Sequence, residues 1–137
     1  MSNYVDYSED NKNIWISYIK KLLNVLYTTG DILLFGLVLQ QIYEYSVWFV
    51  QNSGGKPFNV KDLFIINPDI SFKHMCQNLC QVRNIATHQP YNLSKKSNKI
   101  VEVLSSECFK ELLVYVFKDD ASMFDEMLST YSRWLYE

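Results

Sequence analysis

The sequence predicts an all-α protein that folds as an up-and-down bundle of four to five helices. The chain has 137 residues, of which 48% are apolar and 20% charged, a composition typical of one soluble domain with a substantial core. Four glycines and three prolines are too few for a turn-rich β-sandwich and favour long helices. Apolar residues recur every three or four positions, and no strand-like alternation, repeat or linker interrupts them. We therefore expect residues 1–137 to form a single domain.

The first helix is expected from about Glu9 to Thr28, with Ser8 as a candidate N-cap. Six apolar residues have the spacing of one buried face: Ile14, Tyr18, Ile19, Leu22, Leu23 and Leu26. Gly30 ends this helix, and Asp31 can cap a second helix that continues to about Gln51.

The second helix contains a run, ILLFGLVLQQIYEYSVWFV (residues 32–50), that has the length of a membrane span. Gln40, Gln41 and Glu44 lie near its middle, where each polar side chain would be costly in lipid. A helix that is apolar on nearly all sides is also typical of a bundle centre, or of a helix shared with a partner subunit. We expect such a central helix and no membrane span.

The second half of the chain is expected to hold three more helices. NSGGKPFN reads as a loop and VKDLFIINP as a short helical turn. A third helix is expected to begin at Asp69 or Ser71 and to end before Pro90, because the residue before a proline disfavours the helical conformation. A polar connection, NLSKKSN, leads to a fourth helix over about 98–117, and a fifth begins near Asp120 or Ser122. The expected apolar stripes are Val101, Leu104, Cys108, Leu112 and Val116 on the fourth helix, and Phe124, Met127, Leu128, Tyr131 and Leu135 on the fifth.

Charge and cysteine content narrow the function classes. A net charge of −2 and a pI of about 5.7 give no sign of nucleic-acid binding by the whole protein, so such binding requires a local cationic patch. Three cysteines and a polar N-terminus without a targeting pattern suggest reduced thiols in a cytoplasmic protein. His74, Cys76 and Cys80 lie close in sequence, but no second ligand pair follows at a finger-like spacing. We expect buried thiols, no metal and no cofactor.

The third helix is expected to have two contrasting faces. Its apolar face comprises Phe72, Met75, Cys76, Leu79, Val82 and Ala86, and the opposite face comprises His74, Gln77, Gln81, Asn84 and His88. The second face is polar but almost uncharged, whereas a solvated helix face usually carries Lys and Glu. Amides and imidazoles bind a partner or a ligand without the desolvation cost of full charges. They also suit a helix that lies beside a polar loop, and both readings stay open.

Arg83 is one of only two arginines, and it does not belong to that polar face. In a regular helix its side chain points with the apolar face, about 140° away from His88. A guanidinium that is withdrawn from water needs a carboxylate or a phosphate partner. Arg83 is therefore expected either to pair with a core carboxylate, such as Glu44 or Glu102, or to bind phosphate.

Residues 83–88, Arg-Asn-Ile-Ala-Thr-His, resemble the Arg-Asn-x3-His signature of the HEPN superfamily (higher eukaryotes and prokaryotes nucleotide-binding domains). The motif stands where that family carries it, at the end of a long helix before a polar loop. The resemblance covers the motif strictly, and the rest of the chain only as a small all-helical domain. It implies a metal-independent endoribonuclease, often a toxin or an antiphage effector, that acts as a homodimer with two facing motifs.

The resemblance also implies roles for the residues. RNA carries its own nucleophile in the 2′-OH, so the reaction needs a proton acceptor, a proton donor for the leaving 5′-oxygen, and positive charge on the phosphorane. His88 from two copies would divide the roles of base and acid, and Arg83 would carry the phosphate charge. Asn84 would orient a histidine or a phosphate oxygen.

Four further residues are expected to contact the substrate. Gln81 shares the polar face with the motif, and Lys95 and Lys96, with Lys99, can supply the local basic patch, although such a run also suits a solvated loop. Tyr91 lies three positions after the histidine. In one toxin branch of the family a tyrosine lies two positions after it and is modified by a partner nucleotidyltransferase antitoxin. The alternative for Tyr91 is an aromatic residue that packs on the loop.

Two other functions fit the same residues. One is a non-catalytic HEPN-type module that binds a nucleotide or presents a protein-interaction surface. The other is a helical adaptor in which Arg83 is purely structural. Metal-free RNA cleavage separates the ribonuclease from both alternatives.

Overall fold

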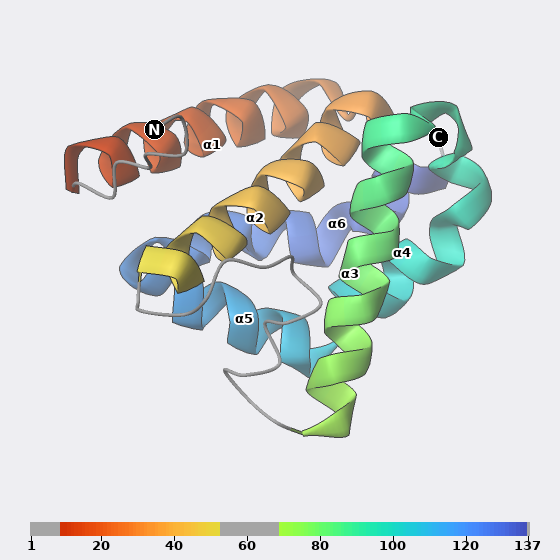
Figure 1. The fold of residues 1–137 in the computed structure, drawn as a ribbon. Helices are drawn as coiled ribbons and strands as arrows, with labels where there is room; N and C mark the ends of the chain where they lie inside the picture. The colour runs from red at the N-terminus through yellow and green to blue at the C-terminus, as the bar shows by residue number, and fades with distance from the viewer. Residues whose placement is uncertain (1–8, 53–68, 137) are drawn as a thin grey trace.

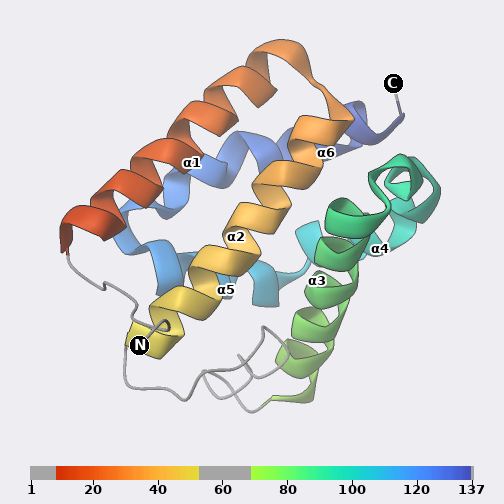
Figure 2. The ribbon, with the colours of Figure 1, turned by 45° about the horizontal axis from the view of Figure 1, so that its top comes forward.

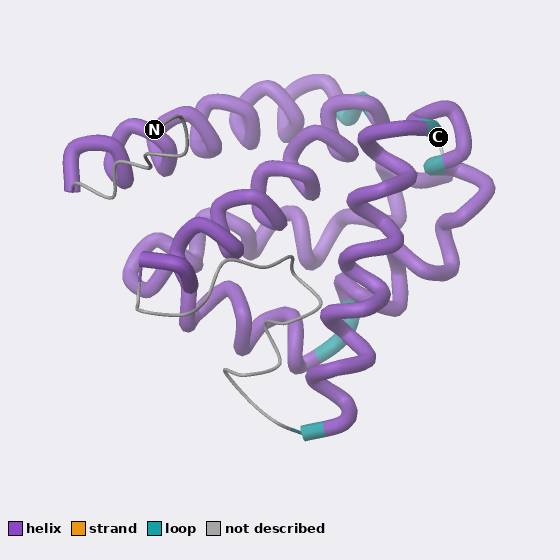
Figure 3. The backbone as a smooth tube through the Cα atoms, in the orientation of Figure 1, coloured by secondary structure: helices purple, strands orange, loops and turns teal. Residues whose placement is uncertain are grey.

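The computed structural model describes residues 9–52 and 69–136 of the chain. Within these ranges every element is helical, which confirms the prediction of an all-α bundle. The α-helices are α1 (Glu9–Thr29), α2 (Ile32–Asn52), α3 (Ile70–His88), α4 (Ser97–Leu104), α5 (Glu107–Phe117) and α6 (Asp125–Tyr136). Short 3-10 helices connect them: η2 (Pro90–Asn92), η3 (Ser94–Lys96) and η4 (Lys118–Phe124). Figure 3 shows how little of the described backbone lies outside helices.

Helix α2 is the centre of the bundle (Figure 1). It packs against α1 on one side and α3 on the other, and it also contacts α5 and α6. In Figure 2, α1 and α3 lie on opposite sides of α2, with α5 and α6 behind it. By length and hydropathy α2 could cross a membrane, but 56% of its most apolar window is buried inside the protein. A buried core helix passes the same test of composition, and the packing of α2 makes it the core helix that the sequence predicts.

The turn between α1 and α2 follows the predicted chemistry. Gly30 adopts a left-handed φ of +66°, and its N–H donates to the Leu26 carbonyl at 2.7 Å, which ends α1. Asp31 then caps α2, because its Oδ1 accepts from the Leu33 N–H at 2.8 Å. The candidate N-cap Ser8 and the expected loop and helical turn over 53–68 lie outside the described residues.

The predicted apolar face of α1 is wrong at its first two residues. Ile14 and Tyr18 are 66% and 42% exposed, whereas Ile16, Ile19, Leu23 and Leu26 are buried. The buried set also has three- and four-residue spacing, but it is centred on the other side of the helix, with Ile16 about 200° from Ile14. Helix α1 thus has two apolar faces, and the bundle covers one of them.

The fourth predicted helix is broken in two. Helix α4 ends at Leu104 and α5 begins at Glu107, because Ser106 is the N-cap of α5 and its Oγ accepts from the Cys108 N–H at 3.1 Å. The Val101 carbonyl accepts from both the backbone N–H of Ser105 at 2.9 Å and its Oγ at 2.7 Å. The expected start of the fifth helix is also displaced, since residues 118–124 form η4 before α6 begins.

The ends of α3 match the prediction closely. Asp69 occupies the N-cap position, although its side chain makes no capping hydrogen bond. The helix ends at His88, and Pro90 opens η2. The connection over 90–96 is not purely polar in its packing, because Leu93 is buried at 1% exposure. The side chains of Lys96 and Leu135 lie outside what the structure describes.

Candidate functional site

The two predicted faces of α3 are present. Five residues of the apolar face are buried: Phe72, Met75, Cys76, Leu79 and Val82. All five residues of the opposite face are exposed: His74, Gln77, Gln81, Asn84 and His88. Helical periodicity therefore places the amides and imidazoles of α3 on the surface, where a partner or a substrate can reach them.

Arg83 lies at the border between these faces and reaches across to α2. Its Nε and Nη2 both donate to Glu44 Oε1, at 3.1 and 2.7 Å. The pair is only partly shielded, with side-chain exposures of 26% for Arg83 and 37% for Glu44. Of the two carboxylates that the sequence suggested, Glu44 is the partner.

Two more groups hold the guanidinium. The Tyr43 ring lies under it, with 4.8 Å between Cζ and the ring centroid, and Asn84 Oδ1 accepts from Nη1 at 3.2 Å. The hydrogen bond with Glu44 raises the pKa of Arg83 above its ordinary value, so the group is permanently cationic. Three of its five N–H groups are used in these bonds, and two have no partner among the described residues.

A glycine brings α2 and α3 close at this site. A Cβ atom at Gly36 would lie 2.7 Å from Leu93 Cδ1 and 3.4 Å from Ala86 Cβ. The absence of a side chain at Gly36 therefore lets the last turn of α3 and the following η2 segment pack directly on α2.

His88 is placed differently from Arg83. It is the last residue of α3, it is exposed, and in the described ranges its imidazole has no hydrogen bond or ion pair. The structure therefore brings together Arg83, Asn84 and Glu44 within one chain and leaves His88 unattached to them. Any joint action of Arg83 and His88 requires a substrate or a second chain to bridge them.

The other predicted substrate-binding residues lie on α3 and in the segment that follows it. Tyr91 is 73% exposed in η2, Gln81 is exposed on α3, and Lys95 is exposed in η3. The backbone of Lys96 lies in η3. A hydrogen bond of 3.0 Å from Asn92 Nδ2 to Gln89 Oε1 ties the turn that carries Tyr91. Gln81, Tyr91 and Lys95 are thus accessible from solvent.

The segment that carries the signature differs in charge from the rest of the chain. Residues 69–96 contain four cations, Lys73, Arg83, Lys95 and Lys96, against one acid, Asp69. Residues 97–136 contain four cations against seven acids. The signature therefore lies in a segment of net positive charge within an acidic protein, and the charge of Arg83 in that segment is compensated by Glu44 of α2.

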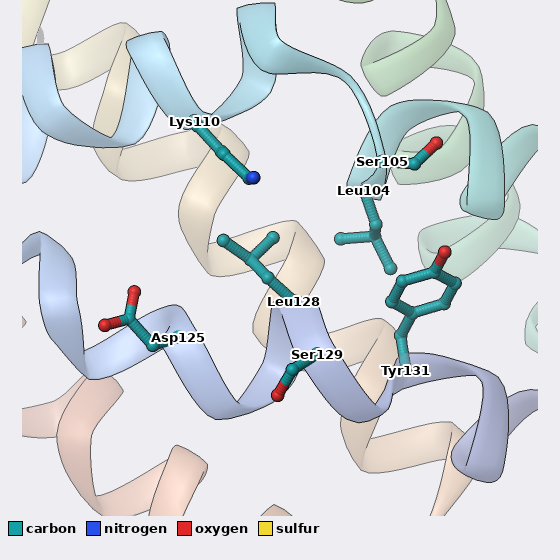
Figure 4. A pocket seen from close by; sticks show the side chains of 7 residues that line it. All are labelled: Leu104, Ser105, Lys110, Asp125, Leu128, Ser129 and Tyr131. Atoms are coloured by element: carbon teal, nitrogen blue, oxygen red, sulfur yellow. The ribbon is translucent and has the colours of Figure 1, made fainter.

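A concave region described in the structure lies elsewhere. Figure 4 shows a pocket between α4, α5 and α6. Lys110 extends toward Leu128, and the hydroxyls of Ser105 and Tyr131 lie at one end. No residue of the signature lines this pocket.

The cysteines do not form a ligand set with histidine. Cys76 is fully buried, and burial raises the pKa of its thiol to about 12, whereas His74 on the same helix is exposed. Across residues 9–52 and 69–136 no group of three or more His, Cys, Asp or Glu side chains is placed to hold a metal ion.

Sequence reasoning missed Tyr43. Its signal was available, because it directly precedes Glu44 on α2 and an aromatic ring beside a carboxylate can flank a guanidinium. Comparison with known proteins gives no match, since no family model, no curated protein and no solved structure resembles this chain significantly.

Proposed function

We propose that this chain is a metal-independent endoribonuclease of the HEPN type, a toxin or antiphage effector that acts in the cytoplasm as a homodimer. Arg83, Asn84 and His88 would be its catalytic residues, and Gln81, Tyr91, Lys95 and Lys96 would contact the RNA. One observation carries the proposal. A guanidinium held by Glu44, Asn84 and Tyr43, with two unused N–H groups, lies five residues before an exposed histidine in a segment of net positive charge.

The chemistry needs no component beyond protein and RNA. His88 of one copy accepts the 2′-OH proton as the oxygen attacks the adjacent phosphorus. The two unused N–H groups of Arg83 bind the phosphorane oxygens, a planar two-point contact that a lysine does not offer. His88 of the second copy donates a proton to the departing 5′-oxygen. The products are a 2′,3′-cyclic phosphate and a 5′-hydroxyl.

The need for two histidines leads to the dimer. A single imidazole cannot conveniently act as base and acid in one step, and each chain contributes one to the signature. The uncharged polar face of α3, with Gln81, Asn84 and His88 exposed along it, is suited to an isologous contact. In this arrangement each residue lies near its own copy.

A second function is favoured by the Glu44 carboxylate. Glu44 compensates the charge of Arg83 and so lowers the attraction of this site for a phosphate. An arginine with a purely structural role forms the same kind of ion pair. A non-catalytic HEPN-type module, which binds a nucleotide or a protein at the same surface, would tolerate this compensation. Such a module would show a nucleotide-dependent rise in melting temperature and no RNA cleavage.

The deciding experiment is incubation of the purified protein with total RNA in the presence of a chelator. Cleavage by the wild type and by Arg133→Ala is expected, since Arg133 is the chain's other arginine and is exposed on α6. Loss of cleavage in His88→Ala assigns the activity to this site. Intact RNA with the wild type, or equal cleavage by wild type and His88→Ala, contradicts the ribonuclease.

A mixed dimer tests whether the site is shared. Wild-type subunits and His88→Ala subunits with a different tag are mixed, and the heterodimer is isolated through both tags. Activity far below half of the wild-type value is expected, because each composite site then lacks its base or its acid. Half of the wild-type activity would mean that each subunit holds a complete site.

Tyr91 is our candidate for control by an antitoxin such as a nucleotidyltransferase. Its side chain is 73% exposed in the turn after His88, so an enzyme can reach the hydroxyl. Coexpression with the cognate antitoxin should add a nucleotide mass to the wild type and none to Tyr91→Phe. An adduct that persists in Tyr91→Phe places the modification elsewhere.

A further inference from the structure

Helix α1 carries a second apolar face that the bundle does not cover. Ile14, Tyr18 and Val25 are 66%, 42% and 50% exposed. On a regular helix they lie within about 40° of one another and about 140° from the centre of the buried face. Isolated exposed apolar residues are ordinary, but a stripe over three turns of one helix is typical of an interaction surface.

Two charged residues lie on the same stripe. Asp10 and Lys21 fall within about 80° of Tyr18 on the helical wheel, near the N-terminal end and in the C-terminal half of α1. Neither has an ion pair with a described residue. Their neighbours on the other side of the helix are paired, Glu9 with Lys12 at 3.7 Å and Lys20 with Asp120 at 2.8 Å. The stripe therefore presents an apolar centre with one uncompensated charge of each sign.

We propose that this stripe of Asp10, Ile14, Tyr18, Lys21 and Val25 binds a second copy of the chain through antiparallel α1 helices. The two-fold axis then crosses the helix pair at the level of residue 16 along α1. Ile14 of one copy meets Tyr18 of the other, and Asp10 of one copy lies within about one residue of the position opposite Lys21 of the other. Both ends of the contact then hold an opposite-charge pair. A parallel pairing would put Asp10 against Asp10 and Lys21 against Lys21, which is repulsive.

The contact is separate from the surface proposed for RNA cleavage. Helix α2 lies between α1 and α3 in both views of the fold (Figures 1 and 2). A chain with two different isologous contacts forms a closed tetramer or an open assembly, depending on the angle between the axes. A single helix face is small compared with a standard interface, so the α1 contact is weak and concentration-dependent.

Charge reversal tests the pairing without any need for ribonuclease activity. Asp10→Lys makes the stripe wholly positive, and Lys21→Asp makes it wholly negative, so each variant repels itself. A mixture of the two restores an opposite-charge pair at both ends of the helix pair. By sedimentation, we expect the mixture to associate about tenfold or more tightly than either variant alone, as two exposed charge pairs change from repulsion to attraction.

Association through α3 would contribute equally to the mixture and to each variant alone. The test of the α1 contact is therefore the difference in association between the mixture and the separate variants. Equal association of the mixture and the separate variants would overturn the proposal. Glu9→Lys is the matched control, because it reverses a charge in the same turn but about 100° away from Asp10, and it should behave as the wild type. Ile14→Lys, checked for helicity by circular dichroism, should weaken self-association of the wild type. If it has no effect, the stripe is not an interface.

Discussion

Arg83 and His88 are five residues apart on α3, yet they have opposite surroundings. Arg83 has partners on α2 and on its own helix, namely Glu44 through two hydrogen bonds, the Tyr43 ring, and Asn84. His88 is exposed at the helix end without a partner among the described residues. One residue of the signature thus takes part in the contact between α2 and α3, and the other does not. Substitutions should separate the two contributions.

The largest effect is expected for His88→Ala. If the proposed mechanism holds, the substitution removes both the base and the acid of the dimer, and a single such group is worth about two to four orders of magnitude in rate. The melting temperature should stay within about a degree of the wild type, because no contact is lost. Cleavage assays and thermal melts on the same preparation check both expectations. A large drop in melting temperature would show that His88 is not as isolated as the structure places it.

Arg83→Ala should reduce both activity and stability. Loss of one group that stabilises the phosphorane costs roughly 3 kcal/mol of transition-state binding, or about two orders of magnitude in rate. The substitution also leaves Glu44 without its partner, at a cost on the order of 1 kcal/mol for a pair this exposed. Arg83→Lys should not restore the rate, because an ammonium lacks the planar fork.

Glu44→Gln tests whether Arg83 is available to an anionic ligand. It keeps a hydrogen-bond acceptor but removes the compensating charge, so Arg83 becomes a stronger anion site. Phosphate or RNA affinity should rise relative to the wild type, as measured by titration. An unchanged affinity would indicate that Arg83 faces only its own protein and not a ligand.

Gly36→Ala should have a smaller effect, on the packing of Leu93 against α2. The new methyl group would lie 2.7 Å from Leu93 Cδ1, so Leu93 or the end of α3 must move. Overpacking of this kind costs about 1–3 kcal/mol, and the gain in helix propensity offsets roughly 0.5–1 kcal/mol of it. We expect a net loss on the order of 1 kcal/mol in denaturant unfolding. A stability equal to the wild type would show that Leu93 adjusts without strain.

Two tyrosine hydroxyls inside the bundle show the same contrast, because one has a hydrogen-bond partner and the other has none among the described residues. Their removal is expected to have the smallest effects on stability. The Tyr27 hydroxyl donates to the Met123 carbonyl at 2.7 Å, whereas the buried Tyr45 hydroxyl has no partner among the described residues. Tyr27→Phe should cost about 1 kcal/mol at neutral pH, and Tyr45→Phe should be neutral or stabilising. Parallel denaturant curves for the two variants provide the measurement.

The same two tyrosines make the free energy of unfolding depend on pH in the alkaline range. Burial raises the pKa of Tyr27 and of Tyr45 to about 12, from an ordinary value of 10.0. The folded state therefore holds these protons more tightly than the unfolded state. Their contribution to stability is complete below pH 10 and is lost as the pH rises through 12. Unfolding curves at pH 9, 10 and 11 should show this fall, and it should be shallower in Tyr45→Phe.

Much of the fold and part of the candidate site could be predicted from local patterns. Helix ends at Gly30, Asp31 and Pro90 follow from backbone chemistry that acts over a few residues, and the two faces of α3 follow from helical periodicity. The Ser105–Ser106 break was also a local signal, but the apolar stripe that runs across it concealed it. The face of α1 was misassigned because two apolar stripes satisfy the same spacing, and spacing does not say which of them a neighbour covers.

By itself, the sequence determined that this is an all-α protein, that α3 has one buried and one polar face, and that Arg83 needs an anionic partner. Only the tertiary structure decided that the partner is Glu44, 39 residues away, and that Tyr43 completes the support. Helical periodicity determines which side chains share a face of one helix. Which residues of two helices touch depends on how closely and at what angle the helices pack. Here the missing side chain of Gly36 lets Ala86 and Leu93 pack closely on α2, Arg83 reaches its partners on α2, and His88 stays exposed at the end of α3.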